Sequence, residues 1–66
     1  MISYKPFYDT LFKKGLTEYY LIFKQGLSAN TLYRMKKGKA ISTKTLDVLC
    51  DILDCEVSDI IKFEKE

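Results

Sequence analysis

The stretch that decides the fold runs from Thr17 to Gly38 and reads TEYYLIFKQGLSANTLYRMKKG. Its apolar spacing predicts two short helices, over residues 18–24 and 29–37, joined by residues 25–28. This connection is short and pivots on Gly26, because glycine adopts turn conformations that other residues avoid. So tight a link forces the helices to cross at a steep angle. Residues 17–38 therefore predict two crossed helices, of which the second projects from the body of the domain.

One local pattern marks the start of both helices and occurs a third time further along the chain. An apolar residue is followed by Ser or Thr, then by three residues and a Leu, at 16–21, 27–32 and 41–46. The hydroxyl suits an N-cap, which accepts a hydrogen bond from a free backbone N–H. The apolar residue and the Leu have the spacing of a hydrophobic staple. The pattern predicts helix starts at Thr17, Ser28 and Ser42.

Glycine, proline and apolar spacing predict the remaining elements. Gly15, Gly26 and Gly38 each follow a helical stretch, where a left-handed residue commonly ends a helix. The predicted helices span residues 6–14, 18–24, 29–37, 43–53 and 57–61, the last being short. Residues 2–5 and 61–64 alternate in polarity, and a short antiparallel strand pair is one interpretation of these ends. We therefore expect one all-α domain of five helices over residues 1–66, with that strand pair as an open addition.

Apolar residues recur at helical spacing, and this spacing predicts a core rather than a ligand site. The expected core positions are Phe7, Tyr8, Leu11 and Phe12 in the first helix, Leu32 and Met35 in the third, and Leu46, Leu49, Cys50 and Leu53, with Val48 and Ile52 beside them, in the fourth.

Length and composition favour a binding module over an enzyme. The chain has 66 residues, 47% of them hydrophobic, and contains no His. A domain this small has a marginal core and no room for a catalytic cleft. It also lacks a nucleophile arrangement and a glycine-rich phosphate loop, and Asp47 and Asp51 fit a solvated helix face. We therefore expect no enzymatic activity, no cofactor and no small-molecule substrate.

The two cysteines and the absence of long apolar runs bear on the cellular compartment. Cys50 and Cys55 are not spaced as a CxxC pair. We interpret them as small buried hydrophobic residues that stay reduced, with a disulfide or metal role as the alternative. No signal peptide or membrane-spanning run is visible. The sequence thus predicts a cytoplasmic protein without a metal site or membrane contact.

Charge is distributed unevenly along the chain. The net charge is only +2, but residues 1–44 carry nine Lys and Arg against two acidic residues. Residues 45–66 carry two Lys against seven acidic residues. Such asymmetry favours one face for a polyanion, although a solvated mixed surface would share this composition.

The crossed helices have the arrangement of a helix-turn-helix, whose second helix fits the major groove of DNA. Residues 17–38 resemble the helix-turn-helix of the Cro and lambda-repressor-like group, the XRE family of transcriptional regulators. The flanking helices and the ending at 53–61, which is similar to that of compact bacterial members, extend the resemblance over most of the chain. The matching residues are Leu21, Gly26, Leu27, Ser28, Leu32, Met35, Lys37, Gly38 and Lys39. The resemblance implies sequence-specific binding of double-stranded DNA for transcriptional regulation, with the recognition helix over residues 28–37.

The same resemblance implies which side chains contact DNA. Arg34 suits a bidentate contact to guanine, and Asn30 suits adenine. An alternative for residues 36–39 is a solvated helix end favoured by the helix dipole. The implied base-reading residues are Ala29, Asn30, Tyr33 and Arg34, and the implied phosphate contacts and added charges are Thr17, Ser28, Thr31, Lys36, Lys37, Lys39 and Lys44.

Helix 18–24 departs from the family pattern. Glu18 stands where a phosphate-binding Gln is frequent, so it should repel phosphate unless it turns away or caps the helix. Ile22 replaces a frequent Ala, and Gln25 replaces a frequent apolar residue, which suggests a rotated or differently packed helix. Three aromatic residues either complete the core with the first helix or form an exposed patch for a partner: Tyr19, Tyr20 and Phe23.

Two other functions stay open on this sequence. A protein-interaction module on the same scaffold, such as an antagonist of another regulator, would use the acidic third or these aromatic residues. Binding of single-stranded nucleic acid by stacking is weaker, since the tyrosines lie on helices. Members of the family usually dimerise on paired half-sites. A homodimer would draw its surface from the C-terminal residues or from helix 18–24.

Overall fold

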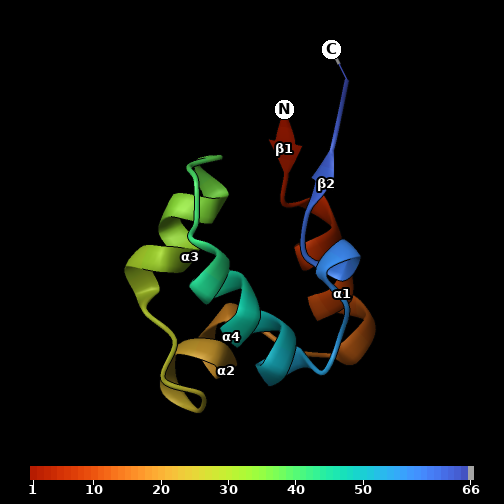
Figure 1. Ribbon diagram of the computed structural model, residues 1–66. Helices are drawn as coiled ribbons and strands as arrows, with labels where there is room; N and C mark the ends of the chain where they lie inside the picture. The colour runs from red at the N-terminus through yellow and green to blue at the C-terminus, as the bar shows by residue number, and fades with distance from the viewer. Residues whose placement is uncertain (66) are drawn as a thin grey trace.

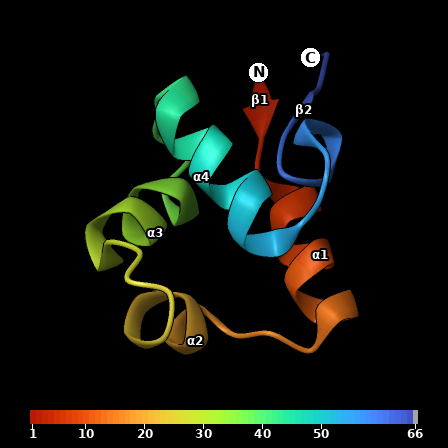
Figure 2. The ribbon, with the colours of Figure 1, turned by 60° about the horizontal axis from the view of Figure 1, so that its bottom comes forward.

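Four α-helices and a pair of very short strands make up the computed structural model, which describes residues 1–65. Helix α3 lies on one flank, α1 on the opposite flank and α4 between them, in both views (Figures 1 and 2). The chain ends lie side by side at the strand pair (Figure 1). The elements in order are β1 (Ile2–Ser3), α1 (Lys5–Lys14), α2 (Glu18–Phe23), α3 (Ala29–Lys36), α4 (Thr43–Leu53), the 3-10 turn η1 (Val57–Asp59) and β2 (Lys62–Phe63).

The three predicted N-caps are confirmed. Thr17 Oγ1 accepts a hydrogen bond from the Tyr20 backbone N–H at 3.1 Å. Ser28 and Ser42 do the same for the backbone N–H groups three residues on, at 3.4 and 3.1 Å. These bonds satisfy donors that have no partner within their own helix. The starts of α2, α3 and α4 are thus fixed by residues within four positions of each start.

Left-handed residues end the helices as predicted, with one addition. Gly15, Gly26 and Gly38 have φ of 67°, 72° and 75°. A fourth left-handed residue, Asp54 at φ 50°, ends α4. Its N–H donates to the Asp51 carbonyl at 3.4 Å. Asp54 is unexpected because only glycine adopts this conformation without a steric cost.

The strand pair is present, whereas the fifth helix is only a turn. Strands β1 and β2 pair antiparallel, with Ile2 opposite Phe63. The predicted helix at 57–61 was wrong: the segment makes a single 3-10 turn over Val57–Asp59. The carbonyl of Asp59 accepts the Thr10 hydroxyl of α1 at 2.7 Å, and its carboxylate accepts the Glu56 N–H at 3.0 Å. The second of these bonds caps the start of the turn, and the chain enters β2 three residues after its end.

The core draws on every helix, and half of the twelve predicted positions are buried, while four more are partly buried. Phe12 is the main error, because its side chain is 87% exposed. The buried row of α1 runs through Phe7, Thr10 and Leu11, so that Thr10 takes a place that the apolar pattern did not predict. Val48 is also exposed, at 38%. The buried apolar residues are Tyr4, Phe7, Leu11, Leu21, Leu32, Met35, Leu49, Leu53 and Ile60.

The cysteines, the possible metal ligands and the helix lengths bear on the expected core, metal sites and membrane contact. Cys50 and Cys55 have free thiols and are half-buried against the core, so they are less enclosed than predicted. Residues 1–65 contain no group of three or more metal-binding side chains of the His, Cys, Asp or Glu type. None of the helices in this range has the length and apolar character needed to cross a membrane.

Candidate nucleic-acid interface

Helix α3 is held by its inner face, which leaves its outer face free. Leu32 and Met35 are 1% and 2% exposed. The turn before α3 is fixed by Gly26 in the left-handed region and by the Leu27 N–H, which donates to the Leu21 carbonyl at 2.9 Å. Leu21 is itself fully buried in α2. The two helices of the predicted helix-turn-helix are therefore anchored in one core, and the pose of α3 is fixed by that core.

The residues expected to read bases lie on the free face of α3. Ala29, Asn30, Tyr33 and Arg34 are all exposed, and Tyr33 is 59% exposed. Tyr33 also contacts a neighbouring side chain of the protein. The ammonium of Lys37 lies 5.6 Å from the centre of the Tyr33 ring, within cation–π range. A continuous outward row thus combines amide, aromatic and cationic groups.

At the N-terminal end of α3, two predicted phosphate contacts and one lysine predicted to add charge come together. Ser28, Thr31 and Lys44 border one hollow of about 210 Å³ between the turn at 25–28 and α4. Ser28 and Lys44 are exposed, and Thr31 is half-buried. Lys44, in the first turn of α4, is distant from Ser28 in sequence, so only the fold gathers these groups. Hydroxyls and an ammonium at a helix start are suited to a phosphate group.

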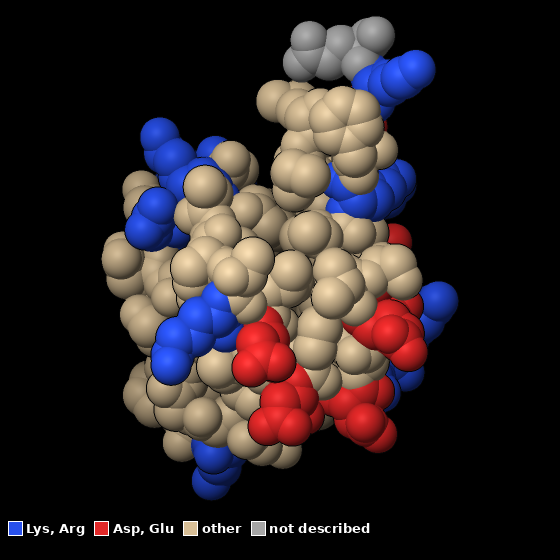
Figure 3. All heavy atoms as spheres, viewed as in Figure 1, with Lys and Arg blue, Asp and Glu red and all other residues tan. Residues whose placement is uncertain are grey.

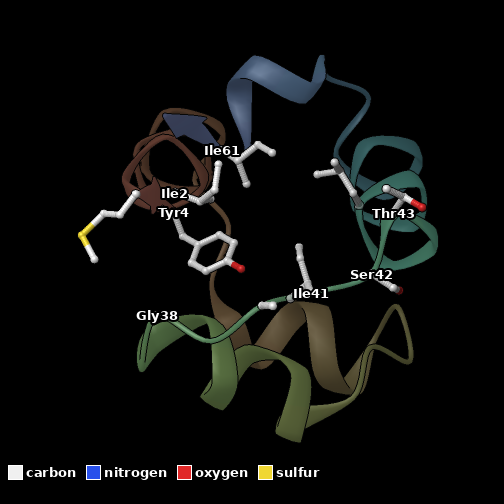
Figure 4. Close-up of a pocket in the computed structure, with 10 residues that line it drawn as sticks. Ile2, Tyr4, Gly38, Ile41, Ser42, Thr43 and Ile61 are labelled. Carbon is white, nitrogen blue, oxygen red and sulfur yellow. The ribbon is translucent and has the colours of Figure 1, made fainter. Parts of the chain in front are cut away.

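At the C-terminal end of α3, the segment after the helix is tied to the strand pair. Tyr4 donates its hydroxyl to the Lys39 carbonyl at 2.5 Å. Tyr4 points into a hollow of about 320 Å³ between the strand pair and the segment that includes Ile41 and Ser42 (Figure 4). Lys37 and Lys39 are exposed beside this anchored backbone. The α3–α4 connection thus has a fixed course and presents two lysines at its start.

Arg34 has a contact that the sequence did not indicate. Its Nη2 donates to the Ala40 carbonyl at 3.2 Å, which draws the guanidinium toward the segment between α3 and α4. Arg34 borders a further hollow, of about 420 Å³, together with Thr31, Ala40 and Ser42. Ser42 was expected only as an N-cap, and nothing in the local pattern marked Ala40. Four guanidinium N–H groups take no part in this hydrogen bond.

Glu18 turns toward α3. Its Oε1 lies 3.5 Å from Nζ of Lys36, which joins the first turn of α2 to the last turn of α3. The carboxylate therefore faces a cation, although the pair stays open to solvent. Lys36 remains exposed, but its charge is partly neutralised by this contact. Thr17, one residue earlier, is exposed at the N-cap of α2.

The aromatic residues of α2 divide between the core and the surface. Tyr20 packs against the core, and its hydroxyl accepts the side-chain N–H of Gln25 at 2.9 Å. Tyr19 and Phe23 are each 66% exposed, with ring centres 4.5 Å apart. One of the three aromatic residues thus packs on the core and two are exposed, while a partner for the exposed pair stays a prediction.

Charge is unevenly distributed over the molecular surface. Basic side chains flank α3 and also lie along the opposite edge, whereas acidic side chains gather over α4 and the segment that follows it (Figure 3). Asp47 and Asp51 are exposed on α4, and Asp54 and Glu56 follow it. The flank with α3 therefore offers the more favourable surface for a polyanion.

Comparison with known proteins agrees with this arrangement. A family model described as the Cro/C1-type HTH DNA-binding domain matches residues 11–66. A solved structure entitled "Crystal structure of transcriptional regulator VanUg, Form II" is similar over 98% of this chain and 87% of that one, at 26% identity and a TM-score of 0.86. No curated protein sequence matches the chain. The family is one of DNA-binding regulators rather than enzymes. By its fold and by this match, the chain belongs to the family of Cro/C1-type helix-turn-helix DNA-binding domains.

Proposed function

We propose that this protein binds double-stranded DNA sequence-specifically and regulates transcription, with residues 28–37 as the recognition helix in the major groove. The exposed row on α3, formed by Asn30, Tyr33, Arg34 and Lys37 above buried Leu32 and Met35, is the observation that carries this proposal. A single α-helix fits the major groove, where base edges are fully distinguishable. The likeness to transcriptional regulator VanUg supports the regulatory role.

Each group of residues has a defined part in the proposed complex. Asn30 and Arg34 contact base edges, Ala29 meets a thymine methyl, and Tyr33 lies against the groove beside them. Arg34 keeps one N–H on Ala40 and uses its other donors for guanine, since a guanidinium carries five. The groups proposed to hold phosphates at the two ends of the helix are Thr17, Ser28, Thr31, Lys36, Lys37, Lys39 and Lys44.

The test is a fluorescence-anisotropy titration with duplexes selected from a random pool, at two salt concentrations. Arg34→Ala should relax sequence preference, at a cost of about 1–3 kcal/mol for the preferred site. Lys37→Ala should weaken binding to all duplexes alike and lower the salt slope by about 1.

The matched control is Lys62→Ala, which removes the same charge from β2, a strand separated from α3 by β1 (Figure 1). Lys62→Ala should leave the sequence preference and the salt slope near those of the unaltered protein. Unchanged binding in both α3 variants would overturn the residue assignment. A lack of duplex binding at low salt would overturn the proposed function itself.

A protein-binding role is the second candidate, and the exposed pair Tyr19 and Phe23 favours it. Contiguous exposed apolar groups, unlike single scattered ones, mark interaction surfaces. The same pair could supply the surface of a homodimer, which would place two α3 helices on paired half-sites. Sedimentation of the protein with and without Tyr19→Ser and Phe23→Ser separates these roles. A dimer of the unaltered protein that is lost in the variants supports homodimerisation. If the unaltered protein and the variants are all monomers, the partner is a different protein.

A further inference from the structure

The end of α4 holds Cys50 and Cys55 next to each other. The Cys55 N–H donates to the Cys50 carbonyl at 3.1 Å, and the Asp54 N–H donates to the Asp51 carbonyl at 3.4 Å. Asp54 between them is left-handed, at φ 50°. This set of bonds is a Schellman motif. In such motifs the side chains of the two residues joined by the longer bond, here Cys50 and Cys55, commonly touch. The fold thus pairs two thiols that are five residues apart in the chain.

The backbone geometry is compatible with a disulfide. The hydrogen bond from the Cys55 N–H to the Cys50 carbonyl limits the distance between the Cα atoms of these two residues. Even with all the connecting bonds in line, this distance would be about 7 Å. Real hydrogen bonds bend, and disulfides span Cα separations of about 4.4–6.8 Å. The thiols also influence each other: burial raises the pKa of Cys55, and the Cys50 thiol raises it further.

Both cysteine residues are partly open to solvent, and one borders a hollow. Cys50 and Cys55 are half-buried and free. Cys55 borders a hollow of about 220 Å³ between the end of α1 and the α4–η1 segment. Thr10, Lys13, Lys14, Asp54 and Asp59 border it as well, so that charges of both signs surround the hollow.

We propose that Cys50 and Cys55 are a modification site, which forms an intramolecular disulfide by exchange with a small-molecule disulfide such as oxidised glutathione. One protein thiolate attacks a sulfur of the reagent, forms a mixed disulfide and releases one glutathione thiolate. The other protein thiolate then attacks the protein sulfur of the mixed disulfide and releases the second. The two protein thiols lose two protons and two electrons, and one glutathione disulfide is reduced to two thiols.

The bond would lock an existing structure rather than create a new one. Because the Schellman hydrogen bonds already hold the two residues, oxidation requires no movement of α3. The folded chain should therefore favour the disulfide more than the unfolded chain does, and by linkage the disulfide stabilises the fold by the same factor. The proposal does not depend on DNA binding, so its failure would leave the proposed function unaffected.

The experiment equilibrates the protein with mixtures of reduced and oxidised glutathione, folded in buffer or unfolded in urea, followed by acid quenching and mass spectrometry. The expected product is a monomer lighter by two hydrogen atoms, with both cysteines in the tryptic peptide 45–62. The equilibrium constant for the disulfide should be at least about tenfold larger in the folded protein than in the unfolded chain.

Single variants give the matched controls. Cys50→Ser and Cys55→Ser each keep one thiol and should accumulate a glutathione adduct in place of the internal disulfide. An equal or smaller equilibrium constant in the folded protein would overturn the proposal, because the fold would then give the pair no advantage. Glutathione adducts or linked dimers as the main products of the unaltered protein would overturn it too.

Discussion

The carboxylate of Glu18 lies 3.5 Å from the ammonium of Lys36, at the point where the start of α2 approaches the end of α3. An acidic residue close to a DNA-binding helix would ordinarily repel phosphate. Here it neutralises part of the positive charge of that helix and links the two helices of the motif. Because the pair is open to solvent, its contribution to stability is small, on the order of 0–1 kcal/mol.

Glu18→Gln should therefore strengthen DNA binding while changing stability little. Removal of the carboxylate frees Lys36 for phosphate, and the gain should reach about 1 kcal/mol at low salt and shrink at high salt. Anisotropy titrations at two salt concentrations measure it. Glu56→Gln is the control, since it makes the same charge change beyond α4. Weaker binding by Glu18→Gln would mean that the ion pair matters more for positioning α3 than for charge.

Tyr8→Phe should preserve or raise stability. The Tyr8 hydroxyl oxygen is buried and has no hydrogen-bond partner within residues 1–65. A buried polar group without a partner costs about 1–3 kcal/mol, so its removal is expected to be neutral or to add up to about that amount.

Tyr4→Phe is the comparison, because the Tyr4 hydroxyl donates to the Lys39 carbonyl. It should cost about 1 kcal/mol. Urea unfolding of the two variants gives both free energies. A large loss for Tyr8→Phe would reveal a bond to water or to another molecule.

Stability should fall as the pH rises above about 8.5. Burial raises the pKa of Cys55, as do Cys50 and Asp59, while Lys14 opposes the shift. Burial, and then Glu18, raise the pKa of Tyr8. Groups with a raised pKa keep their proton in the folded state after the unfolded chain has lost it. Their contribution is complete below the ordinary values of about 8.5 for Cys and 10 for Tyr, and it is lost as the pH passes their folded values.

Urea unfolding at pH values from 7 to 11, under reducing conditions, measures this loss. The double variant Cys55→Ala and Tyr8→Phe should show a shallower decline than the unaltered protein. Identical declines would assign the alkaline loss to other groups.

Asp54→Gly should stabilise the fold by about 0.5–1 kcal/mol. Asp54 is left-handed at the end of α4, where glycine has no steric cost and where a carboxylate opposes the helix dipole. Asp51→Gly, three residues earlier within the helix, should instead destabilise by about 0.3 kcal/mol, the difference in helix propensity between Asp and Gly. Thermal unfolding compares the two. Destabilisation by Asp54→Gly would imply that the Asp54 side chain holds a contact worth more than the backbone strain.

The sequence by itself determined the elements whose causes are local. Thr17, Ser28 and Ser42 cap their helices because each N-cap bond joins residues three apart. Gly26 and Gly38 take the left-handed conformation because backbone sterics at a single residue decide it. The position of the turn and the bounds of α3 follow from these features, and so does the family of the protein.

The tertiary structure decided everything that joins distant residues. The fifth helix is shortened to a turn where the Asp59 carbonyl accepts the Thr10 hydroxyl of α1 and where residues 62–63 pair with β1. Phe12 lies outside the core because the packing of α1 selects Thr10 in its place. Arg34 bends toward Ala40, and Glu18 meets Lys36, because α2, α3 and the segment after them share one core. Periodicity states which residues share a helix face, but only the packing of all helices states which face is covered and which charges meet.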